Sequence, residues 1–545
     1  MFETTPNEPP FGKIALCLSG GGYRAAAFHL GTLKTLEELN LLSEAKYFST
    51  ASGGTITAMK YVITRVENRT FKDFFNQTYK FLHQINVVAE AFKILETTPP
   101  QSGSNNLSLI RSGAEVYRRE LIGLKNSGDS NAEEWTIKDL RDEIAKSGKF
   151  HDLIFNSTEF RTGNGFRFRA TAGRELVFGN KHTPVKEKLY NQISLADIIA
   201  STSCFPGVFE PIRFPEDFKL ADRSQAQDPF STENDDLKTI ALMDGGIFDN
   251  QGLYGMTVSY SDEPLPFKLM IVSDTTARND ELLKYDINPR ETGISVKHIL
   301  WLIIGFLCVL LICSMALIGK IVWALIGKIF WGQTFLSITD TFVFLIAGAF
   351  SFSFSVLILY LIRLAISKIK LLRIMEADFP IWSYLKNLNV RDLWILISGR
   401  LFSVQAMTFN VFMKRIRALQ FTNTMSAIGR KTRKNLFNGK TVFVNIYDLS
   451  PQNNYEAVRE LDPNLEPTPK MKQIAKDAEG IGTKLWLKKD ELDILVNCGR
   501  ITTCYSLLKF YWEGDYAEFT KPNNETSPFY RIYEKWLELR KEFSQ

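Results

Sequence analysis

The sequence predicts an α/β protein with a mainly parallel central sheet and an inserted pair of membrane-spanning helices. Short apolar runs alternate with longer helix-forming segments, and glycines follow the first two of these runs. Two long uncharged segments between residues 296 and 373 predict the inserted pair.

The first four predicted elements alternate regularly. Residues 13–18 form a short apolar run without helical spacing, which predicts a buried strand, and residues 25–42 carry leucines near helical spacing. Residues 46–50 and 55–66 repeat this strand and helix. Such alternation is typical of a parallel sheet that helices cover on both faces, so we expect a three-layer domain.

The remaining elements are predicted from shorter patterns. Residues 98–114 combine Pro, Gly, Ser and Asn and predict an exposed loop. The acids of residues 216–236 could coordinate calcium, but they lack the glycine-centred spacing of an EF-hand loop, which favours a solvated loop. Further strands are predicted at residues 166–172, 239–243, 269–273 and 441–447, and further helices at 195–201, 404–419, 471–478 and 492–512.

Two segments are long and apolar enough to cross a bilayer as helices. Residues 299–319 and 341–362 contain no formally charged side chain. Two buried core helices are the alternative, but helices of globular proteins rarely remain apolar on all sides for six turns. We therefore expect a transmembrane hairpin over residues 296–373, with a loop at 320–340.

A basic region follows the second predicted span. Residues 363–434 hold 14 lysines and arginines against Glu376, Asp378 and Asp392, a net charge of +11 in a chain of net +5. Cations beside a span indicate the cytoplasmic side and attract anionic lipid head groups. We expect an anionic membrane surface as a partner and no nucleic acid, since no nucleic-acid motif accompanies the charge.

Other features of the chain favour a reducing compartment. The N-terminal residues 1–13 carry acids and prolines where a secretory signal would need a basic start and an apolar run. The six cysteines form no C-x-x-C pair and no dense disulfide framework.

Ser52 has the surroundings of an activated nucleophile. It follows a predicted strand, precedes a predicted helix, and is flanked by Ala51, Gly53 and Gly54, which suit the tight turn of a nucleophile elbow. The G-x-S-x-G pattern is incomplete, because Thr50 occupies the first glycine position.

The triple glycine Gly20, Gly21 and Gly22 lies between the first strand and the first helix. Glycines there allow backbone N–H groups to converge on an anion at the positive end of a helix. Neither the nucleotide P-loop pattern nor G-x-G-x-x-G is present. The turn could hold a phosphate or an oxyanion.

Four stretches together resemble the patatin-like phospholipase family. Residues 19–25 (SGGGYRA) resemble its oxyanion loop, 51–54 (ASGG) its serine elbow, and 243–246 (MDGG), followed by Asn250, the element that carries its catalytic aspartate. Residues 200–211 (ASTSCFPGVFEP) resemble a family stretch just before that aspartate. The resemblance covers residues 10–275 and leaves 296–373 unexplained.

The resemblance implies a Ser–Asp dyad. Ser52 would be the nucleophile and Asp244 its proton acceptor, while the N–H groups of Gly20, Gly21 and Gly22 would form the oxyanion hole, with Gly53 and Gly54 in the elbow. A catalytic triad in the order Ser, Asp, His would require a histidine after an acid-bearing motif late in the chain. None of the five histidines meets this requirement; they are His29, His83, His151, His182 and His298.

Two residues near the predicted site leave alternatives open. Arg24 is a candidate contact for a substrate phosphate, or alternatively a partner in a surface ion pair. His29 falls on the helix after the glycines, where packing or capping is favoured over action as a base.

The predicted function is that of a membrane-anchored lipid acyl hydrolase acting on glycerophospholipids, without cofactor or metal. The predicted organisation is a patatin-like catalytic domain at residues 10–290, the hairpin at 296–373, and a basic, mainly helical portion at 374–545 that packs on the catalytic domain. We expect an integral membrane protein with its catalytic domain on the cytoplasmic side. A catalytically silent membrane scaffold or lipid-binding protein is the alternative, and an enzyme could serve either housekeeping or a toxin or defence role.

Overall fold

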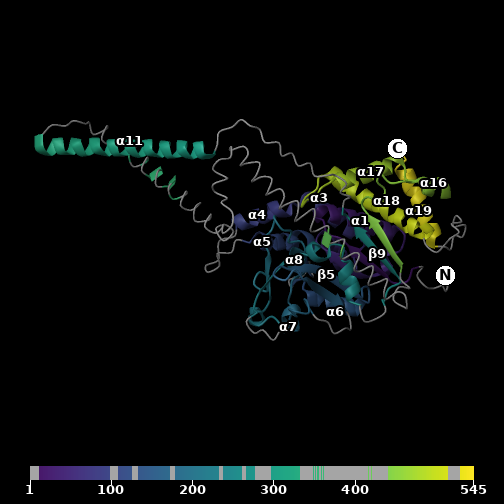
Figure 1. Cartoon of the computed structure of the whole chain (residues 1–545). Coiled ribbons are helices and arrows are strands. Elements are labelled where there is room, and N and C mark those ends of the chain that lie inside the picture. Colours follow the sequence, from purple (N-terminus) through teal and green to yellow (C-terminus); the bar gives the residue numbers. More distant parts are fainter. Residues whose placement is uncertain are drawn as a thin grey trace. The chain divides into compact units, whose positions relative to one another are not determined.

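The computed structural model describes most of the chain, and the chain divides into two compact units (Figure 1). The described residues are 11–97, 108–125, 133–171, 178–231, 237–260, 265–276, 296–331, single positions within 346–360 and 415–419, 440–513 and 528–544. One unit comprises residues 1–280 and 412–545, and the other comprises residues 281–411.

The first unit contains a mixed, mostly parallel sheet. Its strands are ordered β10-β9-β1-β2-β5-β8-β7, and β6 pairs with β5. The pairs from β10 to β5 are parallel, whereas β5 is antiparallel to both β6 and β8, and β7 is antiparallel to β8. The strands are β1 (Ile14–Leu18), β2 (Ala45–Ala51), β5 (Asp152–Glu159), β6 (Gly165–Thr171), β7 (Ile212–Phe214), β8 (Ile240–Asp244), β9 (Leu269–Asp274) and β10 (Lys440–Asn445), while β3 (Leu124–Lys125) and β4 (Glu133–Glu134) form a separate pair.

Hydrophobic clusters lie on both faces of this sheet, as the alternation of strands and helices predicts. Within β1, Ile14, Leu16 and Leu18 join the larger cluster and Ala15 and Cys17 join the smaller one, because successive side chains of a strand point to opposite faces. Helices α1 (Gly22–Glu38), α2 (Gly53–Val66) and α18 (Lys489–Glu513) contribute to the larger cluster, and α10 (Leu253–Val258) contributes to the smaller.

Side-chain caps define several of the peripheral helices. Thr70 and Asp73 form a capping box at the start of α3, as do Thr136 and Asp139 at the start of α6, which ends at Gly148 in the left-handed conformation. These helices are α3 (Phe71–Gln84), α4 (Val87–Thr97), α5 (Leu109–Val116), α6 (Ile137–Ser147), α7 (Glu187–Tyr190), α8 (Leu195–Thr202), α9 (Gly246–Asp249), α16 (Glu456–Leu461), α17 (Pro469–Gly480) and α19 (Pro528–Glu542).

The C-terminal part completes the first unit. Strand β10 extends the sheet beside β9, and the Thr35 hydroxyl of α1 donates to the carbonyl of Arg500 in α18. Where α1 and α18 meet, Cβ atoms on Gly31 and Gly499 would overlap the carbonyl oxygens of Val496 and Phe28, so glycines permit the close approach. The strand predicted at 441–447 and the helices predicted at 471–478 and 492–512 are confirmed, whereas 404–419 lies almost wholly outside the described residues.

One expectation for the first unit is wrong, and one strand is not predicted by the sequence. Residues 109–114, predicted as part of an exposed loop, belong to α5 and include the buried Ile110 and Ala114. The apolar side chains there pack against the core, which overrides the turn-forming composition of the preceding residues. Strand β5 was absent from the sequence prediction, because only three apolar residues, Leu153 to Phe155, precede the polar run Asn156–Glu159.

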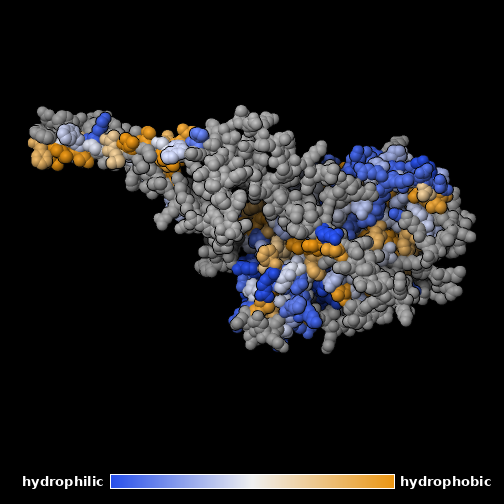
Figure 2. Space-filling model, in the orientation of Figure 1, coloured by the Kyte–Doolittle hydropathy of each residue, from blue (hydrophilic) through white to orange (hydrophobic). Residues whose placement is uncertain are grey.

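The second unit contains α11 (Val296–Trp331), a single helix of 36 residues. Figure 2 shows hydrophobic residues along its described part. Many are exposed, among them Trp301, Ile312, Met315, Ile329 and Phe330.

The transmembrane hairpin is not confirmed. Among the described residues, no helix combines the length and hydropathy that a membrane span requires. The predicted span 299–319 lies within α11, and the loop predicted at 320–340 is wrong as far as Trp331, since the helix continues through Lys320 and Lys328 and no proline interrupts it. The predicted span 341–362 lies mostly outside the described residues, and the basic region 363–434 lies almost entirely outside them.

Candidate active site

Ser52 occupies a sharp turn between β2 and α2. Its backbone has φ 48° and ψ −120°, a conformation that a non-glycine residue rarely adopts. A Cβ on Gly53 would overlap the carbonyl oxygen of Gly22, and one on Gly54 would overlap that of Leu18. The small residues after Ser52 therefore allow the turn to pack closely against β1 and the triple glycine.

Thr50, the departure from the elbow pattern, is an ordinary strand residue. It lies in β2 without a positive φ, and its Oγ1 is 2.9 Å from Oγ1 of Thr55 in α2. This hydroxyl pair joins the two elements on either side of Ser52, so a threonine is compatible with the sharp turn.

Asp244 is the last residue of β8, and backbone hydrogen bonds surround it. Its Oδ1 accepts from the N–H of Gly246 at 2.7 Å, and its carbonyl accepts from Thr158 Oγ1 at 2.9 Å. The N–H groups of Asp244 and Gly245 donate to the carbonyls of Cys204 and Thr202. The stretch 200–211 thus lies beside Asp244 and fixes the end of β8.

The sheet brings Ser52 and Asp244 to one place. Strand β6 occupies one edge of β5, and on the other edge Asn156 pairs with Ala51 of β2 while Ser157 pairs with Asp244 of β8. Since β2 is parallel and β8 antiparallel to β5, their carboxyl ends meet head to head at consecutive β5 residues, about 3.3 Å apart along the strand. A Cβ on Gly245 would lie 3.4 Å from that of Ala51, consistent with this meeting.

The triple glycine lies at the same place but does not contribute three equivalent amides. The N–H of Gly20 donates to the backbone carbonyl of Asn250 at 2.8 Å. Gly21 and Gly22 have φ of 142° and 61°, which favour glycine. Of the three predicted oxyanion donors, Gly20 is therefore already committed to the protein, and Gly21 and Gly22 are left for the role.

The connection between α17 and α18 lies against the glycine loop. The N–H of Tyr23 donates to the carbonyl of Lys484 at 2.7 Å, and a Cβ on Gly22 would lie 2.5 Å from the same oxygen. Arg24 donates from Nη1 to the carbonyl of Ile481 at 3.0 Å and from Nη2 to that of Thr275.

The side chain of Arg24 is buried, and its guanidinium donates to two backbone carbonyls. Through these two hydrogen bonds, the guanidinium of Arg24 links the glycine loop to the end of β9 and to the C-terminal part. A contact with a substrate phosphate stays a prediction.

His29 has the packing role that its position on the helix favours. Its Nε2 lies 2.9 Å from the carbonyl of Ser19 and its Nδ1 lies 2.9 Å from Oγ of Ser273. Burial lowers the pKa of His29 to about 4, so the ring is neutral near pH 7. A neutral ring must donate from Nε2 to the carbonyl and accept at Nδ1, which leaves no ring nitrogen for Ser52.

Burial also governs the ionisable groups near Asp244. Burial raises the pKa of Tyr117, and the carboxylate of Asp244 adds to this rise. Burial raises the pKa of the Cys204 thiol as well, with a further contribution from Asp244. Both groups are therefore uncharged near pH 7, and Asp244 remains the predicted acceptor of the Ser52 proton.

Three residues of the site carried no predicted role. Asn156 donates from Nδ2 to Oγ of Ser49 and the carbonyl of Thr50 at 3.0 Å each, which supports the end of β2. Thr158 holds the Asp244 carbonyl, and Asn250 holds the Gly20 amide. Asn156 and Thr158 lie in β5, so a sequence prediction of that strand would point to both. The position of Asn250 after the Asp-Gly-Gly element is the signal that points to this residue.

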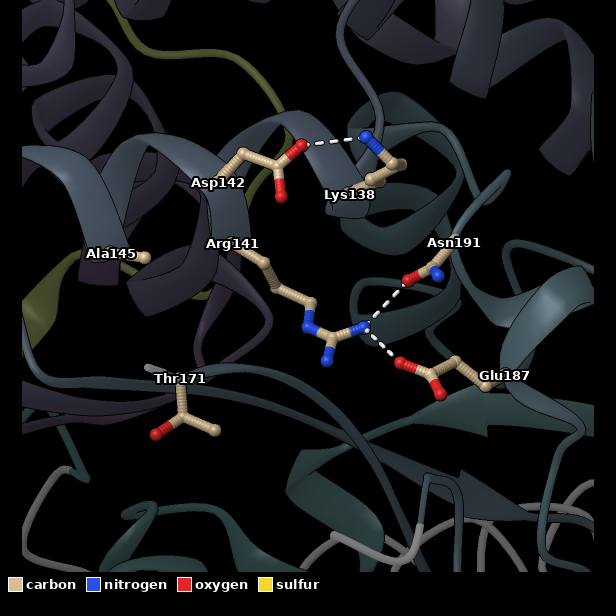
Figure 3. Close-up of a pocket in the computed structure, with 7 residues that line it drawn as sticks. All are labelled: Lys138, Arg141, Asp142, Ala145, Thr171, Glu187 and Asn191. Atoms are coloured by element: carbon tan, nitrogen blue, oxygen red, sulfur yellow. Dashed lines mark hydrogen bonds and ion pairs between the residues drawn. The ribbon is translucent and has the colours of Figure 1, made fainter. Parts of the chain in front are cut away.

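A cavity of about 260 Å³ lies elsewhere, between α6 and α7 (Figure 3). Within it Arg141 contacts Glu187 at 3.1 Å and Asn191 at 2.6 Å, and Lys138 pairs with Asp142 at 2.6 Å. Neither Ser52 nor Asp244 lines this cavity. The charged side chains that Figure 3 draws form ion pairs with one another. It is lined by Lys138, Arg141, Asp142, Ala145, Thr171, Glu187 and Asn191.

The described residues include no group of three or more His, Cys, Asp or Glu side chains arranged to hold a metal ion. Several acids of the loop at 216–236, for which calcium was the alternative, bind neighbouring groups instead. Arg213 pairs with Glu216 and with Asp217 at 2.9 Å each, and Lys186 pairs with Asp228.

Several solved structures have a limited similarity to this chain. The similar solved structures include human GIVD cytosolic phospholipase A2, with 14% identity over 50% of this chain and 47% of that chain and a TM-score of 0.32. They also include the same human enzyme in complex with methyl gamma-linolenyl fluorophosphonate, with 19% identity over 30% of this chain and 23% of that chain and a TM-score of 0.22.

VipD from Legionella pneumophila matches with 13% identity over 97% of this chain and 91% of that chain and a TM-score of 0.26. The matches to the two human phospholipase structures described above span less than half the length of those chains. No curated protein matches significantly. Residues 16–255, which contain Ser52, Asp244 and the triple glycine, match the family model described as patatin-like phospholipase, so this part of the chain is similar to that family.

Proposed function

We propose that this chain hydrolyses acyl esters of glycerophospholipids, with Ser52 as nucleophile and Asp244 as its proton acceptor. The observation that carries the proposal is the meeting of the carboxyl ends of β2 and β8 on one edge of β5, beside the triple glycine. A strained, buried serine and a buried carboxylate at one point of a sheet suit acyl transfer, because a hydroxyl needs a base and an oxyanion site to act as nucleophile.

The reaction has two balanced halves. The Oγ of Ser52 bonds to the ester carbonyl carbon while its proton passes to Asp244, and the carbonyl electron pair moves to the oxygen, which the amides of Gly21 and Gly22 stabilise. Collapse breaks the bond to the lysolipid alkoxide, which takes the proton from Asp244. Water then attacks the acyl-enzyme with Asp244 as base, releasing the fatty acid and restoring the Ser52 hydroxyl.

Fatty-acid release from phospholipid vesicles tests this proposal. Ser52→Ala should abolish release while the thermal unfolding midpoint stays near that of the wild type, and undiminished release by this variant would refute the nucleophile. A fluorophosphonate probe that fails to label the wild type would instead favour the silent lipid-binding alternative.

The proposal includes attachment to a lipid surface through the segment 296–373. It is supported by the exposed apolar side chains of α11 and by the cations that follow in the sequence. Tethering would raise the encounter rate with a two-dimensional substrate without adding contacts at the site. Localisation to a membrane, with the catalytic part on its cytoplasmic side, stays a prediction from the sequence.

Serine substitutions in α11 test the attachment. Replacing Trp301, Met315 and Phe330 together should reduce sedimentation with anionic vesicles and activity on them, while hydrolysis of a soluble short-chain ester is retained. Replacing the exposed Leu461 and Leu537 of the first unit serves as the matched control. Equal vesicle binding by both variants would contradict attachment through α11.

A further inference from the structure

Asn250 lies at the junction of the three parts of the candidate active site. It directly follows α9, and the residue is 4% exposed. Its Oδ1 lies 2.8 Å from the position a Cβ on Gly20 would take, and this position is 3.2 Å from the Cβ of Ser52. The same Oδ1 lies 2.5 Å from the Cβ position of Gly246, which is 2.9 Å from Oδ1 of Asp244.

The two glycines leave space that the Asn250 side chain fills. One glycine belongs to the oxyanion loop and the other to the turn after Asp244, so a larger residue at either position would displace this carboxamide. The side chain is consequently held between the proposed nucleophile and the proposed base.

The amide nitrogen of Asn250 is an orphan within the described part of the chain. Nδ2 is buried and has no hydrogen-bond partner among those residues. A buried donor without a partner is costly to the fold, and such groups often have a functional explanation. A ligand that brings a hydrogen-bond acceptor to this point would remove the cost.

The acceptor is identified by what lies around the carboxamide of Asn250, whose oxygen contacts the Cβ positions of Gly20 and Gly246. Next to Ser52 and Asp244 the nearest substrate atoms are those of the reacting ester, and the carbonyl oxygen becomes negative when Ser52 attacks. The backbone of Asn250 also occupies the Gly20 N–H, which removes one donor from the oxyanion site. The side chain of the same residue can replace that donor.

We propose that Asn250 donates its Nδ2–H to the carbonyl oxygen of the bound ester, so that the oxyanion site comprises Gly21, Gly22 and this side chain. The inference rests on the proposed ester hydrolysis at Ser52. It makes Asn250 a catalytic residue, since the hydrogen bond strengthens as negative charge develops on the reacting oxygen.

The test compares Asn250→Ala and Asn250→Asp with Asn180→Ala in the full-length chain. Asn180 is also buried, but its Oδ1 accepts from the N–H groups of His182 and Thr183 within its own loop. The measurements are kcat and KM on a soluble short-chain ester, the rate of Ser52 phosphonylation by a fluorophosphonate, and the thermal unfolding midpoint.

Both Asn250 variants should lower kcat by about 10²- to 10³-fold with little change in KM, the loss typical of one oxyanion donor. Phosphonylation should slow in parallel, because the probe also develops charge on oxygen, and the unfolding midpoint of Asn250→Ala should stay near that of the wild type. Asn180→Ala should lower the midpoint and leave kcat nearly unchanged.

Wild-type kcat in both Asn250 variants, with Ser52→Ala inactive, would overturn this inference and leave the proposed function intact. A loss of kcat that only follows a lowered midpoint would show a structural role and also overturn it. A wild type that neither hydrolyses ester nor reacts with the probe would overturn the proposed function together with the inference.

Discussion

At the scale of single residues, the site depends on positions that only glycine can occupy. A Cβ on Gly54 would overlap the carbonyl oxygen of Leu18 in β1, and the backbone of a central strand cannot easily move away. Gly54→Ala should therefore lower the free energy of unfolding by about 1–3 kcal/mol, the usual cost of overpacking, and reduce activity.

Chemical denaturation measures this effect, and Gly480→Ala is the matched control. A Cβ on Gly480 meets no atom within 4 Å, and this residue ends α17, so its replacement should be neutral or slightly stabilising. Equal stability of the two variants would contradict the close packing of the elbow on β1.

His29 should make stability depend on pH. Its pKa is lowered from 6.5 to about 4, so between these values the unfolded chain binds a proton that the folded chain does not. The contribution is fully present above pH 6.5 and is lost as pH falls toward 4, on the order of 3 kcal/mol.

Denaturation curves at pH 7 and pH 4.5 for the wild type and His29→Gln measure this effect. Glutamine can still donate to a carbonyl but does not titrate, so the variant should lose less stability between the two pH values. An identical pH dependence in both proteins would show that His29 is not held neutral by burial.

At the scale of elements, the connection between α17 and α18 supports the glycine loop through Arg24. Arg24→Ala should lower the free energy of unfolding by about 1–3 kcal/mol, since buried carbonyls lose charged donors. The activity should fall by the same factor on phospholipid and on an uncharged soluble ester, because Arg24 acts by positioning the loop.

The ratio of the two activities distinguishes the roles of Arg24, with Arg24→Lys as the charge-retaining control. A loss confined to phospholipid would indicate a phosphate contact and contradict the positioning role. Lysine has no planar fork to reach both carbonyls, so Arg24→Lys should resemble Arg24→Ala on both substrates.

Elements with a clear local pattern could be predicted from the sequence, and those set by tertiary contacts could not. Strands β1 and β2 and the helices after them have apolar runs and helical spacing, so their existence follows from the chain alone. The second half of strand β5 contains Asn156, Ser157 and Thr158. Their polar groups bind the ends of β2 and β8 and helix α8, so the burial of β5 depends on partners distant in sequence.

The residues of the site could be named from the sequence, but their arrangement could not. Ser52, Asp244 and the glycines were found from motifs, whereas the hydrogen bond of Gly20 to Asn250 depends on how the Asp244 turn meets the glycine loop. The role of Arg24 depends on Ile481, which lies far away in the sequence.

At the scale of the whole molecule, the first unit is built from two parts of the chain separated by residues 281–411. Strand β10 and helix α18 follow this segment in the sequence. They complete the sheet and its larger hydrophobic cluster. The sequence indicated both elements but not their pairing with β9 and α1, because long-range pairing leaves no local periodicity.

The rate at which a fluorophosphonate labels Ser52, followed by intact mass in wild type and Asp244→Asn, tests the central claim most directly. A single adduct on Ser52 is expected, formed at least about 10²-fold more slowly in Asp244→Asn, because the variant lacks the base that accepts the serine proton. Equal labelling rates in the two proteins would contradict the pairing of Ser52 with Asp244.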